Sequence, residues 1–244
     1  MIRDFKLDIT TIASGSDGNC YCLDDGETPI MIEAGIPLKK IRRALPVVLS
    51  EIQGILLSHE HRDHSGFIHQ IRATDIYATA GTFESLDVPA HHKKVVRQFE
   101  QFRIGTWSIK PFPTIHDAND PCGFLLASGS HKIIFVTDTM SIDVIVPRLT
   151  HIMLECNYSR ALLDKSVKQG IVSEYQKERI VNNHHSLESV IDFLTASDLS
   201  KVEEIHLLHL SRDNSDDGYF KTTVQGLFGI PVYVATYQLM RRGG

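Results

Sequence analysis

The sequence Ser58-His59-Glu60-His61-Arg62-Asp63-His64 directly follows the apolar segment Gly54-Ile55-Leu56-Leu57. Neutral imidazole nitrogens and ionised carboxylates are the ligands that zinc and similar metal ions prefer. Residues two apart in an extended segment point the same way, so the imidazoles of His59 and His61 can converge on one ion. Asp63 and His64 follow at the turn into the next helix, where the change of direction lets them face a second ion. This density of donors at a strand end predicts a metal centre, because packing explains a lone histidine but not such a cluster.

Outward from this stretch, short apolar segments alternate with segments of helical periodicity. The segments expected to be strands are 9–12, 30–32, 54–57, 76–78, 133–136, 152–154, 205–210 and 232–234. Apolar residues spaced three to four apart predict helices over 38–45, 64–72 and 187–194, and Ser186 is the expected N-cap of the last one. Strands that alternate with helices indicate a layered α/β domain.

The histidine-rich stretch resembles the HxHxDH signature of the metallo-β-lactamase superfamily, and further motifs follow in that superfamily's order. Ser14-Gly15-Ser16-Asp17-Gly18-Asn19 is similar to the glycine-rich loop of its WalJ-type branch. Ile30-Met31-Ile32-Glu33-Ala34-Gly35 resembles a strand that ends in Asp-x-Gly, with Glu33 in place of the aspartate. That carboxylate usually supports the metal ligands from behind, so we expect the change to adjust the site and not to abolish it.

Three later motifs complete the resemblance. His116 lies in His116-Asp117-Ala118-Asn119-Asp120-Pro121, Asp138 lies in Val136-Thr137-Asp138-Thr139, and His209 lies in His209-Leu210-Ser211. They resemble the third metal motif, the bridging aspartate and the last ligand motif of the family. His206 is expected to be structural, because only one of His206 and His209 can be a ligand and the motif selects His209.

The resemblance implies an α/β fold, a four-layered αββα sandwich with two mixed sheets, as a single hydrolase domain over residues 1–244. It also implies two Zn²⁺ ions, with Mn²⁺ as the other candidate. One ion is expected to bind His59, His61, His116 and Asp138. The other is expected to bind Asp63, His64, Asp138 and His209.

Two further residues resemble elements of RNase Z and its relatives. Glu155 follows the expected strand 152–154, and His184 stands two residues before Ser186. In those enzymes a histidine that a carboxylate orients lies near the leaving group, which suits proton donation to a departing alkoxide. The resemblance thus assigns His184 as proton donor, Glu155 as its partner and Asp63 as the residue that orients the attacking water. His185 remains the alternative donor.

Composition restricts the compartment and the substrate. The chain has 244 residues, a net charge of −5 and four cysteines without paired CxxC spacing. The N-terminus lacks the apolar core of a signal peptide and no apolar run is long enough for a membrane span. We therefore expect a cytoplasmic protein with free thiols and no membrane partner. The acidic balance disfavours a long nucleic acid, because polynucleotide binding rests on Lys and Arg at the phosphates.

The compact chain also shows no arm or inserted domain that would hold a polymer. It resembles the phage anti-Pycsar phosphodiesterases, which hydrolyse cyclic mononucleotide signals of bacterial defence. The resemblance implies a small cyclic nucleotide substrate, no stable nucleic acid complex, and a host cytoplasm if a phage encodes the chain. It also implies a homodimer, with 160–183 as candidate contact, although that stretch is equally suited to cover its own sheet.

Three alternatives stay open. A WalJ-type DNA exonuclease is the first. A thioesterase or lactonase would leave Glu155 and His184 without a purpose. A binding module without activity would be expected to have lost metal ligands.

Overall fold

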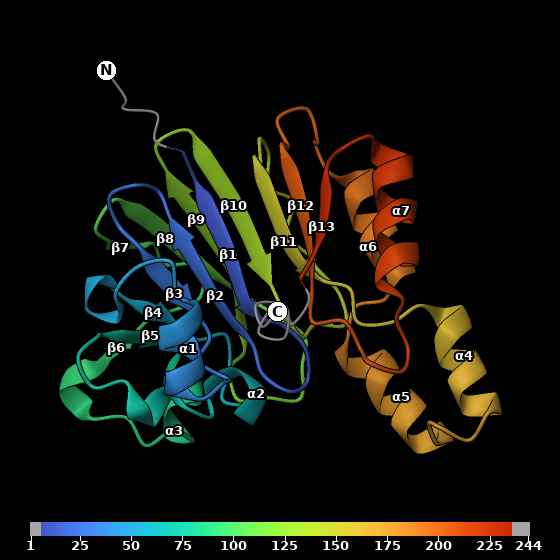
Figure 1. Ribbon diagram of the computed structural model, residues 1–244, viewed down its shortest axis with the longest axis horizontal. Coiled ribbons are helices and arrows are strands. Elements are labelled where there is room, and N and C mark those ends of the chain that lie inside the picture. Colours follow the sequence, from blue (N-terminus) through green and yellow to red (C-terminus); the bar gives the residue numbers. More distant parts are fainter. Residues whose placement is uncertain (1–5, 236–244) are drawn as a thin grey trace. The chain divides into compact units, whose positions relative to one another are not determined.

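The computed structural model describes residues 6–235, which divide into two compact units. Unit 1 comprises 6–113 and Ala118–His131, and unit 2 comprises Thr114–Asp117 and Lys132–Ala235. Figure 1 shows the strands and helices of both units along the chain.

The first sheet lies within unit 1 and has the strand order β1-β2-β3-β4-β5-β6. Its strands are β1 (Asp8–Ala13), β2 (Cys20–Asp24), β3 (Ile30–Ile32), β4 (Ile55–Leu56), β5 (Ile76–Ala78) and β6 (Lys93–Val95). The pairs β1–β2 and β2–β3 are antiparallel, and the pairs from β3 to β6 are parallel. Strands β3 and β4 are buried on both faces, which explains why they read as continuous apolar runs.

The second sheet has the strand order β13-β12-β11-β10-β9-β8-β7. In unit 1, the antiparallel strands are β7 (Phe102–Ile104), β8 (Trp107–Pro113) and β9 (Cys122–Ser128). In unit 2, apart from His131, the parallel strands are β10 (His131–Val136), β11 (His151–Glu155), β12 (Glu204–Leu208) and β13 (Val232–Val234). Both sheets are therefore mixed, as predicted.

The helices of unit 2 begin at side chains that cap them. They are α4 (Arg160–Lys168), α5 (Glu174–Asn183), α6 (Leu187–Ala196) and α7 (Asp217–Phe228). Ser159, Ser173, Ser186 and Asp216 each accept a backbone N–H of the first turn, which satisfies a donor that has no partner within the helix. The predicted cap Ser186 is confirmed. Helices α4 and α5 lie side by side in Figure 1.

The helices of unit 1 are shorter. They are α1 (Leu38–Ala44), α2 (Arg62–Ser65) and α3 (Ala80–Glu84), with 3-10 turns η1 (Leu49–Glu51), η2 (Ile68–Gln70) and η3 (Ala90–His92). The prediction of one helix over 64–72 is wrong, because α2 ends and η2 follows as a separate turn. The Phe67 N–H donates to Ala34 O at 3.0 Å instead of to a carbonyl of the preceding turn, and this bond interrupts the helix.

The α/β class with two mixed sheets and flanking helices is confirmed. All four cysteines are buried and free, as expected. No helix within residues 6–235 combines the length and apolar character that a bilayer crossing requires. The single domain over residues 1–244 stays a prediction.

Candidate metal centre

Unit 1 gathers the donors of the histidine-rich stretch just beyond strand β4. His59 and His61 lie in the loop before α2, and their ring centroids are 4.7 Å apart, edge to face. His64 lies in α2, with its ring centroid 4.2 Å from that of His59. The Asp63 carboxylate is 3.2 Å from His64 Nε2. The structure therefore brings all four predicted donors of unit 1 together.

Asn19 holds the α2 end of this group. Its backbone N–H donates to Asp63 O at 2.7 Å, and its side-chain Nδ2 is 3.2 Å from His64 Nε2. Gly35 N donates to Asn19 O at 2.9 Å, so the glycine-rich loop and the loop after β3 meet at α2. The sequence motif contained Asn19, but nothing in its pattern indicated this contact with the donors.

Glu33 supports the same donors from the interior of unit 1. It is fully buried and has a φ of 65°, in the left-handed region that side chains rarely adopt. Its Oε1 accepts the Ser58 N–H at 3.3 Å and lies 3.5 Å from His64 Nδ1. The longer side chain that replaces the family's aspartate thus still reaches His64.

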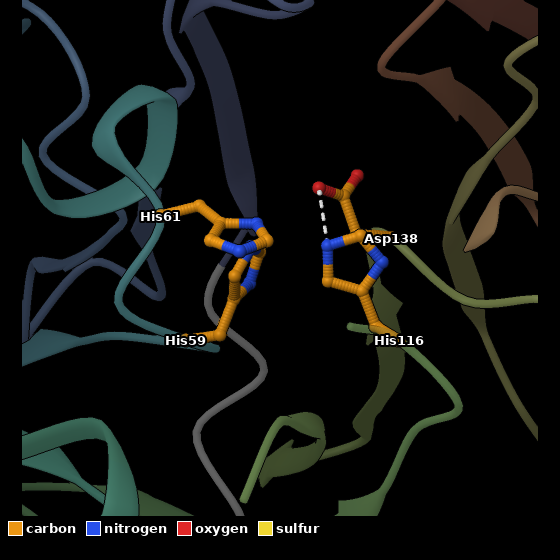
Figure 2. Close-up of side chains that lie close together, drawn as sticks. All are labelled: His59, His61, His116 and Asp138. Carbon is orange, nitrogen blue, oxygen red and sulfur yellow. Dashed lines mark ion pairs between the residues drawn. The ribbon is translucent and has the colours of Figure 1, made fainter. Parts of the chain in front are cut away.

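Unit 2 gathers a second group of donors around Asp138. Asp138 Oδ2 is 3.6 Å from His116 Nε2, and Asp138 Oδ1 is 3.1 Å from His209 Nδ1. Figure 2 shows the ion pair of His116 with Asp138 and also draws the His59 and His61 rings of unit 1. Asp138 follows β10 and His209 follows β12, with φ values of 47° and 52°. Such backbone strain clusters at functional sites, where surrounding structure maintains it.

Glu155 and His184 lie in this second group. Glu155 ends β11 with no exposed surface, and its Oε1 is 2.6 Å from His184 Nδ1. Its Oε2 accepts the backbone N–H groups of Thr139 and His185, both at 3.0 Å. One donor atom each from Asp138, Glu155, His184 and His209 lies within 4.8 Å of the others. Because both Glu155 oxygens already accept hydrogen bonds, Glu155 suits an orienting role better than metal ligation.

Glu155 and His184 each shift the pKa of the other. Burial alone would raise the Glu155 pKa, but the His184 charge and hydrogen bonds from His184 and His209 lower it below its ordinary value. Burial alone would lower the His184 pKa, but the Glu155 charge and hydrogen bond raise it above its ordinary value. The structure thus favours a protonated His184 that can donate a proton.

The two neighbouring histidines have other partners. His185 Nδ1 is 3.2 Å from Met140 O, and burial lowers the His185 pKa. His206 lies within β12, where its Nε2 is 3.1 Å from Glu204 Oε2 and its ring stacks on Tyr233. Neither histidine belongs to a group of metal-type donors among residues 6–235.

Two asparagines that the sequence did not indicate complete the surroundings of unit 2. Asn157 Nδ2 donates to His209 O at 2.9 Å and is 3.2 Å from His209 Nδ1. Asn183 O is 3.2 Å from His116 Nδ1, and its Oδ1 accepts the Asp117 N–H at 2.9 Å. Each asparagine contacts the ring of a predicted ligand and can orient it. Residues around a metal site commonly orient its ligands in this way.

The donor set fits a divalent metal ion. The histidine and carboxylate side chains are buried or partly buried, and the carboxylates of Asp63 and Asp138 lie within 3.6 Å of imidazole nitrogens of other predicted ligands. Imidazole and carboxylate together suit zinc and comparable metal ions.

Residues 28–160 match the family model described as beta-lactamase superfamily domain. The chain is 25% identical over 230 residues to the exodeoxyribonuclease WalJ of Streptococcus pneumoniae serotype 2 (strain D39). The alignment covers 86% of this chain and 83% of that protein. The fold resembles that of Zn²⁺-bound PqqB from Methylobacterium extorquens, with a TM-score of 0.74, 14% identity and coverage of 93% and 97%. It also resembles a diphosphatase from the PhnP family, with a TM-score of 0.66, 14% identity and 95% coverage of each chain.

Proposed function

We propose that this chain, a metal-dependent hydrolase that belongs to the metallo-β-lactamase superfamily, cleaves phosphodiester bonds with two bound zinc ions. The observation that carries the proposal is the contact of 2.6 Å between His184 Nδ1 and Glu155 Oε1. A protonated imidazole held by a buried carboxylate is suited to protonate a departing oxygen. A thioester does not need such a donor, because a thiolate leaves readily without one.

The proposed ligands are the seven residues of the sequence motifs. His59, His61, His116 and Asp138 would hold one ion, and Asp63, His64, Asp138 and His209 would hold the other. Bound divalent ions supply neutralisation of the phosphoryl charge and acidification of water. Manganese is the alternative metal for the same donors.

The chain's own residues then have distinct roles. Asp63 orients the attacking water, and His184 gives its proton to the leaving oxygen. Glu155 keeps the His184 imidazole in one orientation, because the Thr139 and His185 N–H groups hold the carboxylate itself in place. The contact of the His185 ring with Met140 O favours His184 over His185 as proton donor.

The proposed substrates are 3′,5′-cyclic mononucleotides, opened to linear nucleoside monophosphates. Discrimination between bases requires hydrogen bonds to the base whose loss is costly. The residues of the proposed site act on the phosphate, which all these substrates share. The net charge of −5 disfavours a long polyanion. In this proposal the enzyme is a cytoplasmic homodimer that removes a cyclic nucleotide signal of antiphage defence.

DNA is the second candidate substrate. The likeness to the exodeoxyribonuclease WalJ extends over most of both chains, and it favours exonuclease activity over the remaining alternatives.

One assay series tests the proposal. We expect wild-type protein to hydrolyse cyclic AMP, cyclic CMP, cyclic GMP and cyclic UMP at comparable rates, with negligible cutting of DNA or RNA. Elemental analysis should find two ions per chain, and Asp138→Ala should lose both the ions and the activity. Degradation of DNA that weakens steeply with salt, with inert cyclic nucleotides, would establish the exonuclease instead. Activity without bound metal would contradict the mechanism.

A further inference from the structure

A cavity of about 430 Å³ lies in unit 2 beside the proposed proton donor. Small-molecule sites are commonly clefts of about 300–1,000 Å³. Six of its lining residues come from the loop after β11, from α4, and from α5 and its C-cap. They are Tyr158, Arg160, Leu163, Lys177, Val181 and His184. The volume therefore suits a molecule of nucleoside size and not a polymer.

The position of His184 connects this cavity to the reaction. A proton donor must come within about 2.6–3.2 Å of the oxygen that it protonates. His184 Nδ1 is engaged with Glu155, and its ring forms part of the cavity wall. The group attached to the departing oxygen must then lie next to His184. Within unit 2, this cavity is a space beside His184 that can hold that group.

The lining combines an apolar part with a cationic part. Leu163 and Tyr158 are 1% and 4% exposed, whereas Val181 at the rim is 40% exposed. Sites for small molecules are lined mainly by such apolar and aromatic groups, with a few polar groups that select the orientation. A sugar with an attached base offers a flat apolar face and polar edges, which match both parts of this lining.

Arg160 supplies the charge that is not compensated. Lys177 pairs with Asp164 at 2.7 Å, so these two charges offset each other at the cavity wall. No carboxylate within residues 6–235 forms an ion pair with the Arg160 guanidinium; only the Arg160 backbone N–H contacts Glu188. The guanidinium presents five N–H donors, which suit hydroxyl, base and phosphate oxygens.

We propose that this cavity binds the nucleoside carried by the departing oxygen of the phosphodiester, with Arg160 at its polar end. The inference rests on the proposed function, since it assigns the space for that reaction's leaving group. The nucleoside can come from a cyclic mononucleotide or from the end of a DNA strand, because both leave a sugar oxygen next to the proton donor.

Two variants test the cavity. Arg160→Ala removes the polar contact, and Val181→Trp fills the rim without changing a charge. The matched controls are Lys165→Ala, which removes a charge from the exposed face of the same helix, and Val95→Trp, which makes the same valine-to-tryptophan change at an exposed position of β6 outside the cavity.

Adenosine is the probe for binding, because it has no phosphate and its binding needs no turnover. Calorimetry on the metal-loaded protein should show adenosine binding that Val181→Trp abolishes and Val95→Trp preserves. For cyclic AMP, Arg160→Ala should raise KM about tenfold, as the loss of a hydrogen bond from a charged group implies, with kcat less affected. The KM rise should be smaller for thymidine 5′-(4-nitrophenyl phosphate), whose nucleoside is not on the leaving oxygen.

The outcomes separate the cavity from the function. The proposal that the cavity binds the nucleoside would be wrong if Val181→Trp left adenosine binding intact. It would also be wrong if Arg160→Ala and Lys165→Ala changed the KM for cyclic AMP equally. A wild type that hydrolyses no phosphodiester would overturn the proposed function, while the adenosine measurement would still decide the cavity. Comparing cyclic AMP with a deoxyadenosine dinucleotide as substrates identifies which of the two sources supplies the nucleoside.

Discussion

At the residue scale, the proposed chemistry depends on one buried carboxylate with two different tasks. Glu155 Oε2 is held by two backbone N–H groups, so Oε1 remains directed at His184 and His209. A carboxylate fixed in this way raises the His184 pKa and also limits the motion of its ring. The same residue thereby favours the protonated form of the proposed proton donor and fixes the direction of its ring.

Removing the donor should therefore leave metal binding intact and slow the chemistry. We expect His184→Ala to retain its metal content and to lose about 10²–10⁴-fold in turnover of cyclic AMP. The loss should be much smaller for a 4-nitrophenyl ester, because a nitrophenolate leaves without a proton. Steady-state kinetics on both substrates, with metal analysis, measure this difference. Equal losses on both substrates would show that His184 does not act as the acid, and His185→Ala is the control for the alternative donor.

A second buried carboxylate serves stability. Asp25 in unit 1 accepts hydrogen bonds from Ser128 and Thr106, and from the Thr28 N–H at 2.8 Å. Burial alone would raise the Asp25 pKa, but these hydrogen bonds lower it below its ordinary value. The stabilisation is thus complete above the unfolded pKa of about 3.9 and is lost as the pH falls through the folded pKa.

We expect Asp25→Asn to lower the free energy of unfolding by about 1–3 kcal/mol at neutral pH. The difference from wild type should shrink as the pH falls below about 4, because the wild-type carboxyl group then also loses its charge. Denaturant titrations at several pH values measure it. Asp24→Asn is the neighbouring control, since the Asp24 carboxylate accepts the Gly26 N–H in an exposed hydrogen bond of 2.9 Å. A difference that is independent of pH would contradict this account.

At the element scale, the metal-type donors lie where strands end. Donors follow β4, β10 and β12, and Glu155 terminates β11. The carboxyl ends of parallel strands are the usual place for active-site groups in open α/β sheets. This arrangement makes the loops after the strands as important as the ligands that they carry.

The packing of the loop after β3 against α2 can be tested with one methyl group. A Cβ on Gly35 would lie 1.6 Å from Asp63 O and 2.8 Å from Asn19 N, so Gly35→Ala must displace the turn that carries Asp63 and His64. We expect a loss of at least about 1–3 kcal/mol in stability, together with weaker metal binding. Thermal unfolding and metal titration measure the two effects.

Gly226→Ala provides the control for that experiment. Its added Cβ meets nothing within 4 Å, and Gly226 lies inside α7. The variant should be neutral or more stable by up to about 1 kcal/mol, because alanine favours helix over glycine. A Gly35→Ala protein as stable and metal-loaded as Gly226→Ala would contradict the tight packing.

The elements also show which structure the sequence can reveal. Strands β4, β10 and β11 were predictable because they contain the fully buried apolar runs 55–56, 133–136 and 152–154. Strand β8 contains Pro111 and Pro113, which usually argue against a strand, and it was missed. Helix α5 buries only Asn183, so it has no apolar stripe that periodicity could detect.

The site shows a similar division. Its metal-type residues could be named from ordered motifs, because each motif keeps the donor types that the chemistry requires. The supporting residues Asn157 and Asn183 could not, since asparagine at a loop or helix end is ordinary and its role arises only from long-range contacts. The spacing to Ser186 favoured His184 over His185 by one residue only, and the structure distinguishes the two rings by the contact of His184 with Glu155.

For the whole molecule, exposed apolar side chains indicate how two copies of the chain could associate. The connection between α4 and α5 exposes Ile171 (55%) and α5 exposes Tyr175 (78%), although Leu163 of α4 is buried. Tyrosine is enriched at protein interfaces, and a stable interface requires about 800 Å² from each partner. These side chains lie in the segment 160–183, which was predicted from the sequence as a candidate contact between two copies.

We expect wild-type protein at micromolar concentration to scatter light with twice the mass of the 27.4 kDa chain. The double variant Ile171→Glu/Tyr175→Glu should be monomeric, because burying two carboxylates in an apolar contact is strongly unfavourable. Tyr219→Glu/Leu227→Glu is the matched control, since it changes two exposed apolar side chains of α7 that lie outside the proposed contact. A wild type that is monomeric would reject the homodimer. A dimer that resists the first pair of changes and dissociates with the second would move the contact to α7, and 160–183 would then serve only its own unit.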